Sequence, residues 1–297
     1  TLVLFFPLQR LFLGANGLIL KSLEIEGKMK RLLPKEPARP WNHQDKKRIA
    51  ADMLERYTGC DAKEICNHVI ITNFEYYLSR FSKVYNAEIK SGSALSIANC
   101  KERNVSLMVF NIGAPMSALV IEMLSAIQPA SVLMLGMCGG LHRDLRIGDL
   151  FLPMAAIRGE GTTQHFFPEQ VPALPTFAIQ KYVSQVIVNR GLTYHAGVVH
   201  TTDYRFWEYD DSFKLMLKLE KAGAIEMETA ALFIAAFACK VPCGALLLVS
   251  DLPLQEVKTK KSAKDVFQKY TDLHLDIGIE AMTNLEEGAD KIRHFMW

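Results

Sequence analysis

Two acidic residues, Glu226 and Glu228, flank Met227 directly ahead of an almost wholly apolar run that extends to Cys239. So hydrophobic a run predicts a buried helix, and buried carboxylates are costly unless a partner satisfies them. The helix dipole alone would favour acids at a helix start. A carboxylate there could instead accept two hydrogen bonds from the vicinal hydroxyls of a ribose. Because residues two apart on a helix point to different sides, we expect one acid to face a ligand and the other to serve packing or capping.

Further polar residues collect where short apolar segments end. In open α/β sheets, ligands bind beyond the carboxyl ends of the strands. One polar segment end is ordinary, but five together predict one polar pocket. The residues at these five ends are Gly113, then Gly136, Gly139 and Gly140, then Arg158, Glu160 and Thr162, then Thr201, Thr202, Asp203 and Arg205, and finally Ser250 and Asp251.

Each of these signals has a purely structural alternative. The "GMCGG" segment, residues 136–140, could be a tight turn that needs glycine's backbone freedom, or it could bring backbone N–H groups close to an anion. Arg158 could be a surface arginine, or the fixed cation of a phosphate site. Asp251 could cap the turn before Leu-Pro. Phe206 and Trp207 could be core aromatics, or they could wall a flat heterocycle beside Arg205.

Composition excludes several classes of protein. The 297 residues are 49% hydrophobic and 22% charged, with a formal net charge of +2, as is typical of a soluble globular protein. Nucleic-acid binders usually carry a concentrated basic face, so no nucleic-acid partner is expected. Six cysteines without a CxxC pair predict reduced thiols in a cytoplasmic protein. Eight scattered histidines show no zinc-binding spacing, and no metal is expected.

The first 20 residues are apolar, but polar residues such as Gln9, Arg10 and Asn16 interrupt them, which makes a poor membrane span. They also lack the basic start of a signal peptide. The chain begins without Met, and an ordinary polar N-terminus follows from Met29. We therefore expect no membrane association, and we interpret residues 1–28 as lying upstream of the natural start or as a disposable extension.

Short β-branched segments alternate with helical ones along the rest of the chain. This alternation predicts an α/β domain with a largely buried sheet. We expect residues 1–45 to form an N-terminal arm and residues 46–297 a single catalytic domain. The expected strands are 68–72, 106–113, 131–140, 149–161, 195–203 and 244–253, and the expected helices are 46–60, 117–128, 176–191, 223–239 and 272–288.

Four motifs, in their order and spacing, resemble the nucleoside phosphorylase and nucleosidase family: "FNIGAPMSA", "LGMCGGL", "IEMETAA" and "LLVSDLP". The resemblance covers about residues 66–297. Within it, "MAAIRGEGTT" and "VVHTTDYRFWEYD" are similar to AMP nucleosidases. The resemblance implies a three-layer α/β/α sandwich with a central mixed sheet. It also implies hydrolysis of AMP to adenine and ribose 5-phosphate, without metal or cofactor, by a homohexamer.

The resemblance further implies residue roles. Glu228 and Met227 hold the ribose, and Asp251 protonates the departing purine at N7. Two arginines and the glycine-rich segment surround phosphate, and Phe206 or Trp207 flanks adenine. The expected site comprises catalytic Asp251 and Glu228 with substrate-binding Met227, Glu226, Arg158, Arg205, Phe206, Trp207, Gly113, Gly136, Cys138, Gly139, Gly140 and Thr202.

Two other functions stay open at this point. A purine nucleoside phosphorylase or a methylthioadenosine nucleosidase would use a similar pocket. A nucleotide sensor would keep the pocket without the chemistry, but a sensor has no need of an acid at the purine N7, and both Glu228 and Asp251 are present.

Overall fold

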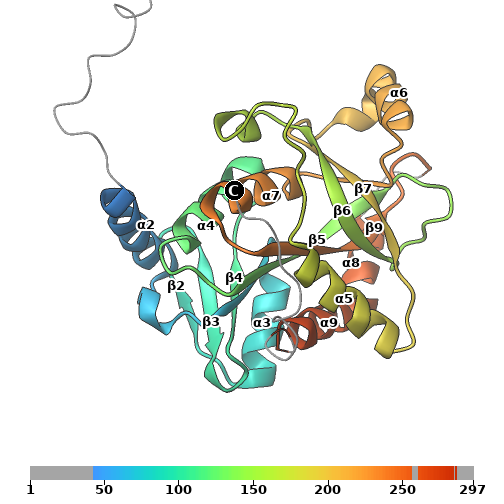
Figure 1. The fold of residues 1–297 in the computed structure, drawn as a ribbon. Coiled ribbons are helices and arrows are strands. Elements are labelled where there is room, and N and C mark those ends of the chain that lie inside the picture. The colour runs from blue at the N-terminus through green and yellow to red at the C-terminus, as the bar shows by residue number, and fades with distance from the viewer. Residues whose placement is uncertain (1–42, 256–259, 284, 286–297) are drawn as a thin grey trace, which may run out of the picture. The chain divides into compact units, whose positions relative to one another are not determined.

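The computed structural model describes residues 43–255, 260–283 and 285 (Figure 1). The chain divides into two units, residues 1–46 and 47–297. The first unit, and with it the expected arm and the hypothesis about residues 1–28, lies almost wholly outside the described residues. The boundary expected near residue 45 therefore stays a prediction. Within the described ranges, no helix is long and apolar enough to cross a membrane.

The second unit alternates strands and helices, as the sequence predicts. The strands are β1 (His68–Thr72), β2 (Ile89–Ser91), β3 (Ser96–Cys100), β4 (Val105–Val109), β5 (Ser131–Gly140), β6 (Leu150–Gly159), β7 (His195–Thr202), β8 (Ala224–Glu226) and β9 (Cys243–Asp251). The helices are α2 (His43–Thr58), which begins in the first unit, α3 (Glu75–Tyr85), α4 (Ala114–Leu124), α5 (Phe177–Asn189), α6 (Asp211–Glu220), α7 (Thr229–Cys239), α8 (Lys260–Lys269) and α9 (Thr271–Thr283).

The strands of the described residues form one mixed sheet in the order β2-β3-β4-β1-β5-β8-β7-β6-β9. Strand β1 is parallel to both β4 and β5, whereas β8 is antiparallel to β5. Strand β9 pairs with β6 and also, in parallel, with β5. The half of the sheet from β5 to β9 therefore closes on itself, which the sequence did not predict. The α/β class with a mixed sheet is confirmed.

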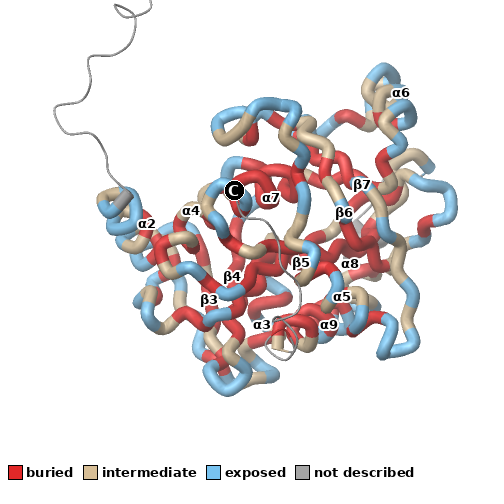
Figure 2. Tube along the Cα trace, in the orientation of Figure 1, coloured by how far each residue is buried: buried red, intermediate tan, exposed pale blue. Residues whose placement is uncertain are grey.

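Helices cover both faces of this sheet (Figure 1). Successive side chains of a strand point to opposite faces, and in β1 Ile71 packs with the core that includes α4 and α7, whereas Ile70 packs with the core that includes α3, α5 and α9. Both side chains are fully buried, and Figure 2 shows α7 and much of β4 and β5 coloured as buried. Each buried aliphatic side chain of this size contributes roughly 1.5–3 kcal/mol of transfer free energy. The two hydrophobic cores, one on each face of the sheet, stabilise the strands whose carboxyl ends carry the expected site residues.

The structure contains elements that the sequence did not predict: strands β2, β3 and β8 and helices α3, α6 and α8. Residues 224–226 form β8 instead of the start of a helix, and α7 begins only at Thr229. Glu226 thus ends a strand, while Glu228 is the residue that precedes the helix. The "GMCGG" segment forms the second half of β5, as the expected strand 131–140 requires, and it pairs with β8 and β9, so the alternative of a tight turn is wrong. A strand of three residues shows too little alternation to be recognised in sequence.

Candidate active site

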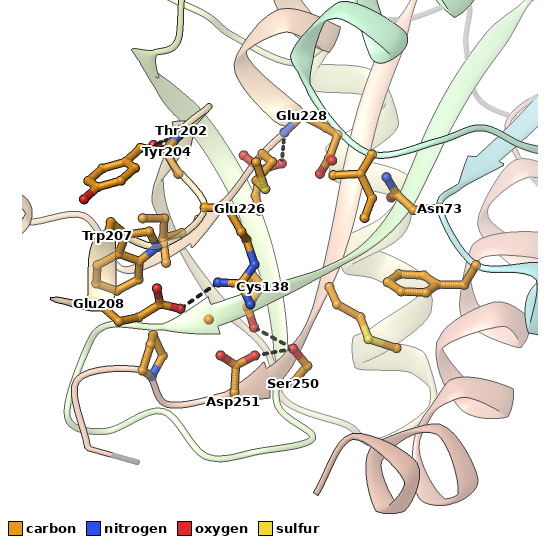
Figure 3. A pocket seen from close by; sticks show the side chains of 18 residues that line it. Asn73, Cys138, Thr202, Tyr204, Trp207, Glu208, Glu226, Glu228, Ser250 and Asp251 are labelled. Carbon is orange, nitrogen blue, oxygen red and sulfur yellow. Dashed lines mark hydrogen bonds and ion pairs between the residues drawn. The ribbon is translucent and has the colours of Figure 1, made fainter. Parts of the chain in front are cut away.

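A cavity of about 220 Å³ opens where the ends of β5, β7, β8 and β9 meet (Figure 3). Polar residues from separate segments converge there, as the strand-end pattern predicts. Of the residues expected at the site, those that line the cavity are Cys138, Gly139, Thr202, Arg205, Trp207, Glu226, Met227, Glu228 and Asp251.

Five expected residues lie outside the lining: Gly113, Gly136, Gly140, Arg158 and Phe206. Gly113 nevertheless touches the site, because its backbone N–H donates to Glu228 Oε1 at 2.7 Å. Its φ of 106° is a conformation that glycine adopts at little cost. Phe206 is 68% exposed, with its ring 5.9 Å from the Arg205 guanidinium carbon.

Glu228 is a buried carboxyl that lines the cavity directly before α7. Burial, reinforced by the charge of nearby Glu226, raises its pKa to about 8, although the hydrogen bond from Gly113 opposes this. When ionised, a carboxylate that lines the cavity is a strong acceptor for ligand hydroxyls, because hydrogen bonds to a charged group are stronger than those between neutral groups.

Glu226 is also buried, but the protein itself occupies its oxygens. Its Oε1 accepts the Thr201 hydroxyl at 2.5 Å. Its Oε2 accepts the backbone N–H groups of Glu228 at 2.8 Å and Thr229 at 2.7 Å. Burial raises the pKa of Glu226, and these hydrogen bonds oppose that rise. The carboxylate therefore caps the first turn of α7.

Asp251 ends β9 and lines the cavity. Its Oδ1 lies 2.6 Å from the Ser250 hydroxyl, which also lies 3.3 Å from the Cys138 carbonyl oxygen. The adjacent strand β5 contributes Gly139, where a Cβ would come within 2.8 Å of Pro253 Cγ. Gly139 thus permits the segment after β9 to pack closely against β5, and this packing places Asp251 at the cavity.

Arg158 serves the loop after β6. Its guanidinium donates to the Thr163 hydroxyl and to three backbone carbonyls, those of Phe167, Pro168 and Val171. Glu160 Oε2 accepts the N–H groups of the same loop at Thr162 and Thr163. Arg158 and Glu160 together fasten residues 160–171 to the end of β6.

Arg205 lies in the segment after β7 and lines the cavity. Its Nη1 donates to Glu208 Oε1 at 2.8 Å, and its side chain is 57% exposed. Trp207 is buried and packs 5.8 Å from the Phe213 ring, centroid to centroid, so one wall of the cavity is a fixed aromatic side chain. Thr202 contributes a hydroxyl that accepts the Tyr204 N–H at 3.0 Å.

Sequence reasoning missed several lining residues. Most directly adjoin predicted segments: Asn73 follows the first expected strand, and Met137 lies inside "GMCGG". Nothing in the sequence marked the others as pocket residues, because their side chains are ordinary apolar or polar groups. The missed residues are Asn73, Phe74, Ile112, Met137, Tyr204, Glu208, Ile225 and Pro253, whereas Ser250 was expected at the pocket as a strand-end residue. In the described part of the chain, no three His, Cys, Asp or Glu side chains are grouped so as to hold a metal ion.

With this fold and cavity, the chain belongs to the Phosphorylase superfamily, whose family model matches residues 67–282. A crystal structure of AMP nucleosidase from Bacteroides thetaiotaomicron is similar, with a TM-score of 0.74 and 36% identity, covering 83% of this chain and 100% of that one. AMP nucleosidase of Escherichia coli is 26% identical over 301 residues, which cover 85% of this chain and 62% of the relative. Uridine phosphorylase of Treponema pallidum is 24% identical, covering 77% of this chain and 93% of the relative. The chain thus matches less than two thirds of the E. coli protein, and the resemblance inferred from the motifs is confirmed.

Proposed function

We propose that the protein hydrolyses the N-glycosidic bond of AMP, releasing adenine and ribose 5-phosphate. The observation that carries this proposal is that two carboxyl groups from separate elements, Glu228 before α7 and Asp251 at the end of β9, line one cavity. The similarity to two AMP nucleosidases supports AMP as the substrate.

The two carboxyl groups match the charges that develop during cleavage. Positive charge grows on the sugar and negative charge on the departing base, and catalysis requires groups that stabilise both more strongly in the transition state. The Glu228 carboxylate accepts the ribose hydroxyls and lies near the developing cation. Asp251 donates a proton to N7 of the purine, which is typically worth about 10²–10⁴-fold in rate.

The 5′-phosphate needs a cation, and we propose Arg205 for it. Among the described residues that line the cavity, Arg205 alone carries a fixed positive charge. Its exposed guanidinium has further N–H groups besides the one that meets Glu208. Most of Arg158's donors are engaged by its own loop, so we assign Arg158 to holding that loop.

The rival function is a nucleoside phosphorylase or methylthioadenosine nucleosidase, and similarity to a uridine phosphorylase favours the former. A phosphorylase uses phosphate as the nucleophile at C1 of the ribose, whereas a nucleotide hydrolase binds phosphate at the 5′ end. The two functions therefore differ in substrate and in their need for added phosphate.

We also propose a homohexamer in the cytoplasm. None of the six cysteines, all within the described ranges, is joined in a disulfide, which supports a reducing compartment. Leu215 and Leu219 of α6 are 58% and 75% exposed, as an assembly surface requires in an isolated chain. Light scattering on the purified protein measures the mass; a monomer would contradict the hexamer.

A substrate panel tests the proposed reaction. The protein is incubated with AMP, adenosine and methylthioadenosine, with and without phosphate, and the products are separated by chromatography. We expect adenine and ribose 5-phosphate from AMP without added phosphate. Release from adenosine or methylthioadenosine only, or a strict need for phosphate, would assign the protein to the rival function.

A further inference from the structure

We infer that Glu226 is a positioning residue, which together with Thr201 fixes the first turn of α7 and thereby aims Glu228 into the cavity, without itself contacting the substrate. This inference deepens the proposed function and relies on it for its kinetic test. It also assigns a role to Glu226, which the sequence left open between packing, capping and substrate binding.

The contacts around Glu226 support this role. A helix leaves its first four N–H groups without partners inside the helix. Here Glu226 Oε2 receives the N–H groups of Glu228 and Thr229, and the Thr201 hydroxyl oxygen receives that of Ala230 at 2.9 Å. The Thr201 hydroxyl in turn donates to Glu226 Oε1. Thr201 and Glu226 thus satisfy three consecutive N–H groups, and they tie the ends of β7 and β8 to the start of α7.

This arrangement leaves little capacity for a ligand. Both oxygens of Glu226 already accept hydrogen bonds from Thr201 and from the backbone at the start of α7. Glu228 accepts the N–H of Gly113 at 2.7 Å and is also approached by the N–H of Met227 and the side chain of Asn73, which lines the cavity beside it. Figure 3 shows Glu226 hydrogen-bonded to the backbone before α7 and Glu228 on the side of Asn73. A ribose therefore meets Glu228, while Glu226 holds the backbone that carries it.

Glu226 also acts on Glu228 through charge. Two buried carboxyls that share a site disfavour each other's ionisation. The other charged or titratable groups lining the same cavity are Asp251, Glu208, Arg205, Tyr204 and Cys138. Of the charges near Glu228, that of Glu226 has the largest effect on its ionisation, after burial.

The test is the pH profile of kcat/KM for AMP in Glu226→Gln. Glutamine keeps the shape and can still accept the N–H groups, but it removes the charge. In the wild type we expect activity to rise with pH as Glu228 ionises, near pH 8. In the variant this rise should move to lower pH by at least about one unit, as expected for coupled buried carboxyls, with KM at pH 9 within about threefold of wild type. The control Glu75→Gln removes an exposed acid at the start of α3 and should shift nothing.

A raised KM at every pH with an unmoved profile would overturn the inference, because that is the signature of a lost substrate contact. Should Glu226→Gln fail to fold, Thr201→Val gives a second test, since Thr201 does not line the cavity. We expect its kcat to fall by about tenfold with little change in KM, and Thr201→Ser, which keeps the hydroxyl, to restore kcat. A loss confined to KM, or no loss in Thr201→Val, would again contradict the positioning role.

Failure of the proposed function has a different signature. If the wild type releases no adenine from AMP, the profile cannot be measured, and the ionisation of Glu228 is followed instead by NMR of carboxyl-labelled glutamate. The inference then predicts a lower pKa of Glu228 in Glu226→Gln than in the wild type. An unchanged pKa would overturn it whatever the substrate is.

Discussion

The ends of β6 and β7 lie side by side, with Arg158 of β6 in register with Thr201 of β7. Each of these two strand ends carries, or is followed by, an arginine with an acidic residue close to it. At β6 the pair is Arg158 and Glu160, whose polar atoms bind the backbone of their own loop. At β7 the pair is Arg205 and Glu208, which bind each other and line the cavity. The two pairs have the same residue types but different neighbours. The guanidinium of Arg158 donates to backbone carbonyl groups and supports a loop, whereas that of Arg205 lies beside the cavity and is available to a ligand.

Asp251, at the end of β9, is the residue whose change should affect catalysis most. In Asp251→Asn the side chain keeps its shape but loses the acidic proton, so we expect kcat for AMP to fall by at least about a hundredfold. Steady-state kinetics measure the loss, and an unchanged Tm serves as the control for folding. Near-normal turnover would remove Asp251 from the mechanism.

Glu228→Gln should reduce kcat/KM by about a hundredfold, through the lost carboxylate, yet stabilise the protein. The pKa of Glu228 is raised in the folded state, to about 8, so the folded protein holds a proton that the unfolded chain has released. Stability therefore falls as pH rises from the usual glutamate range towards 8. Thermal melts should show a higher Tm than wild type at pH 8, and no such gain near pH 4. A lower Tm at both pH values would show that Glu228 contributes to stability as an ion.

The same contrast explains how far the sequence could predict the molecule. Apolar segments predicted β1 and β5 with the bounds that the structure has. A strand that is buried on both faces leaves an unbroken hydrophobic run in the sequence, which is easily recognised. Strand β8 has only three residues, and its partners β5 and β7 lie far from it in the sequence. No local sequence pattern therefore predicted this strand. The predicted helix consequently began too early.

The site residues could be predicted where they are unusual residue types at strand ends. They could not be predicted where the role of a residue depends on contacts with residues distant in the sequence. Glu228 and Asp251 were both predicted as site residues, from their positions in the motifs and from the resemblance of those motifs to the nucleoside phosphorylase and nucleosidase family. Both carboxyls line the cavity. The role of Arg158 depends on carbonyls of the loop at residues 167–171, which only the folded chain brings to it. In the same way Thr201, which no motif singled out as a capping residue, contacts Glu226 from the neighbouring strand β7, opposite it in register.

Arg205→Ala tests whether the arginine beside the cavity binds the 5′-phosphate. We expect KM for AMP to rise about tenfold or more and KM for adenosine to change much less, because a charge-assisted hydrogen bond to phosphate is lost. The stability should change little, since the ion pair with Glu208 is half-exposed and such pairs contribute about 0–1 kcal/mol. An equal loss for AMP and adenosine would place Arg205 away from the 5′-phosphate.

Arg158→Ala should have the smallest effect on the substrate and a clear effect on the fold. Its removal leaves several loop carbonyls without donors, at about 1 kcal/mol or more in total, which corresponds to roughly 2–4 °C in Tm per kcal/mol for a domain of this size. The ratio of KM for AMP to KM for adenosine should stay within about twofold of wild type. A selective rise in KM for AMP would make Arg158 a phosphate ligand and remove the contrast between the two strand ends.

Hydrolysis of AMP in this cavity, with Asp251 as the acid, can be measured in a single time course. Wild type and Asp251→Asn are incubated with AMP in phosphate-free buffer, and adenine and ribose 5-phosphate are quantified over time. We predict equal amounts of the two products from the wild type and at least about a hundredfold slower release from the variant. No adenine from the wild type, or the same rate from both proteins, would contradict the account.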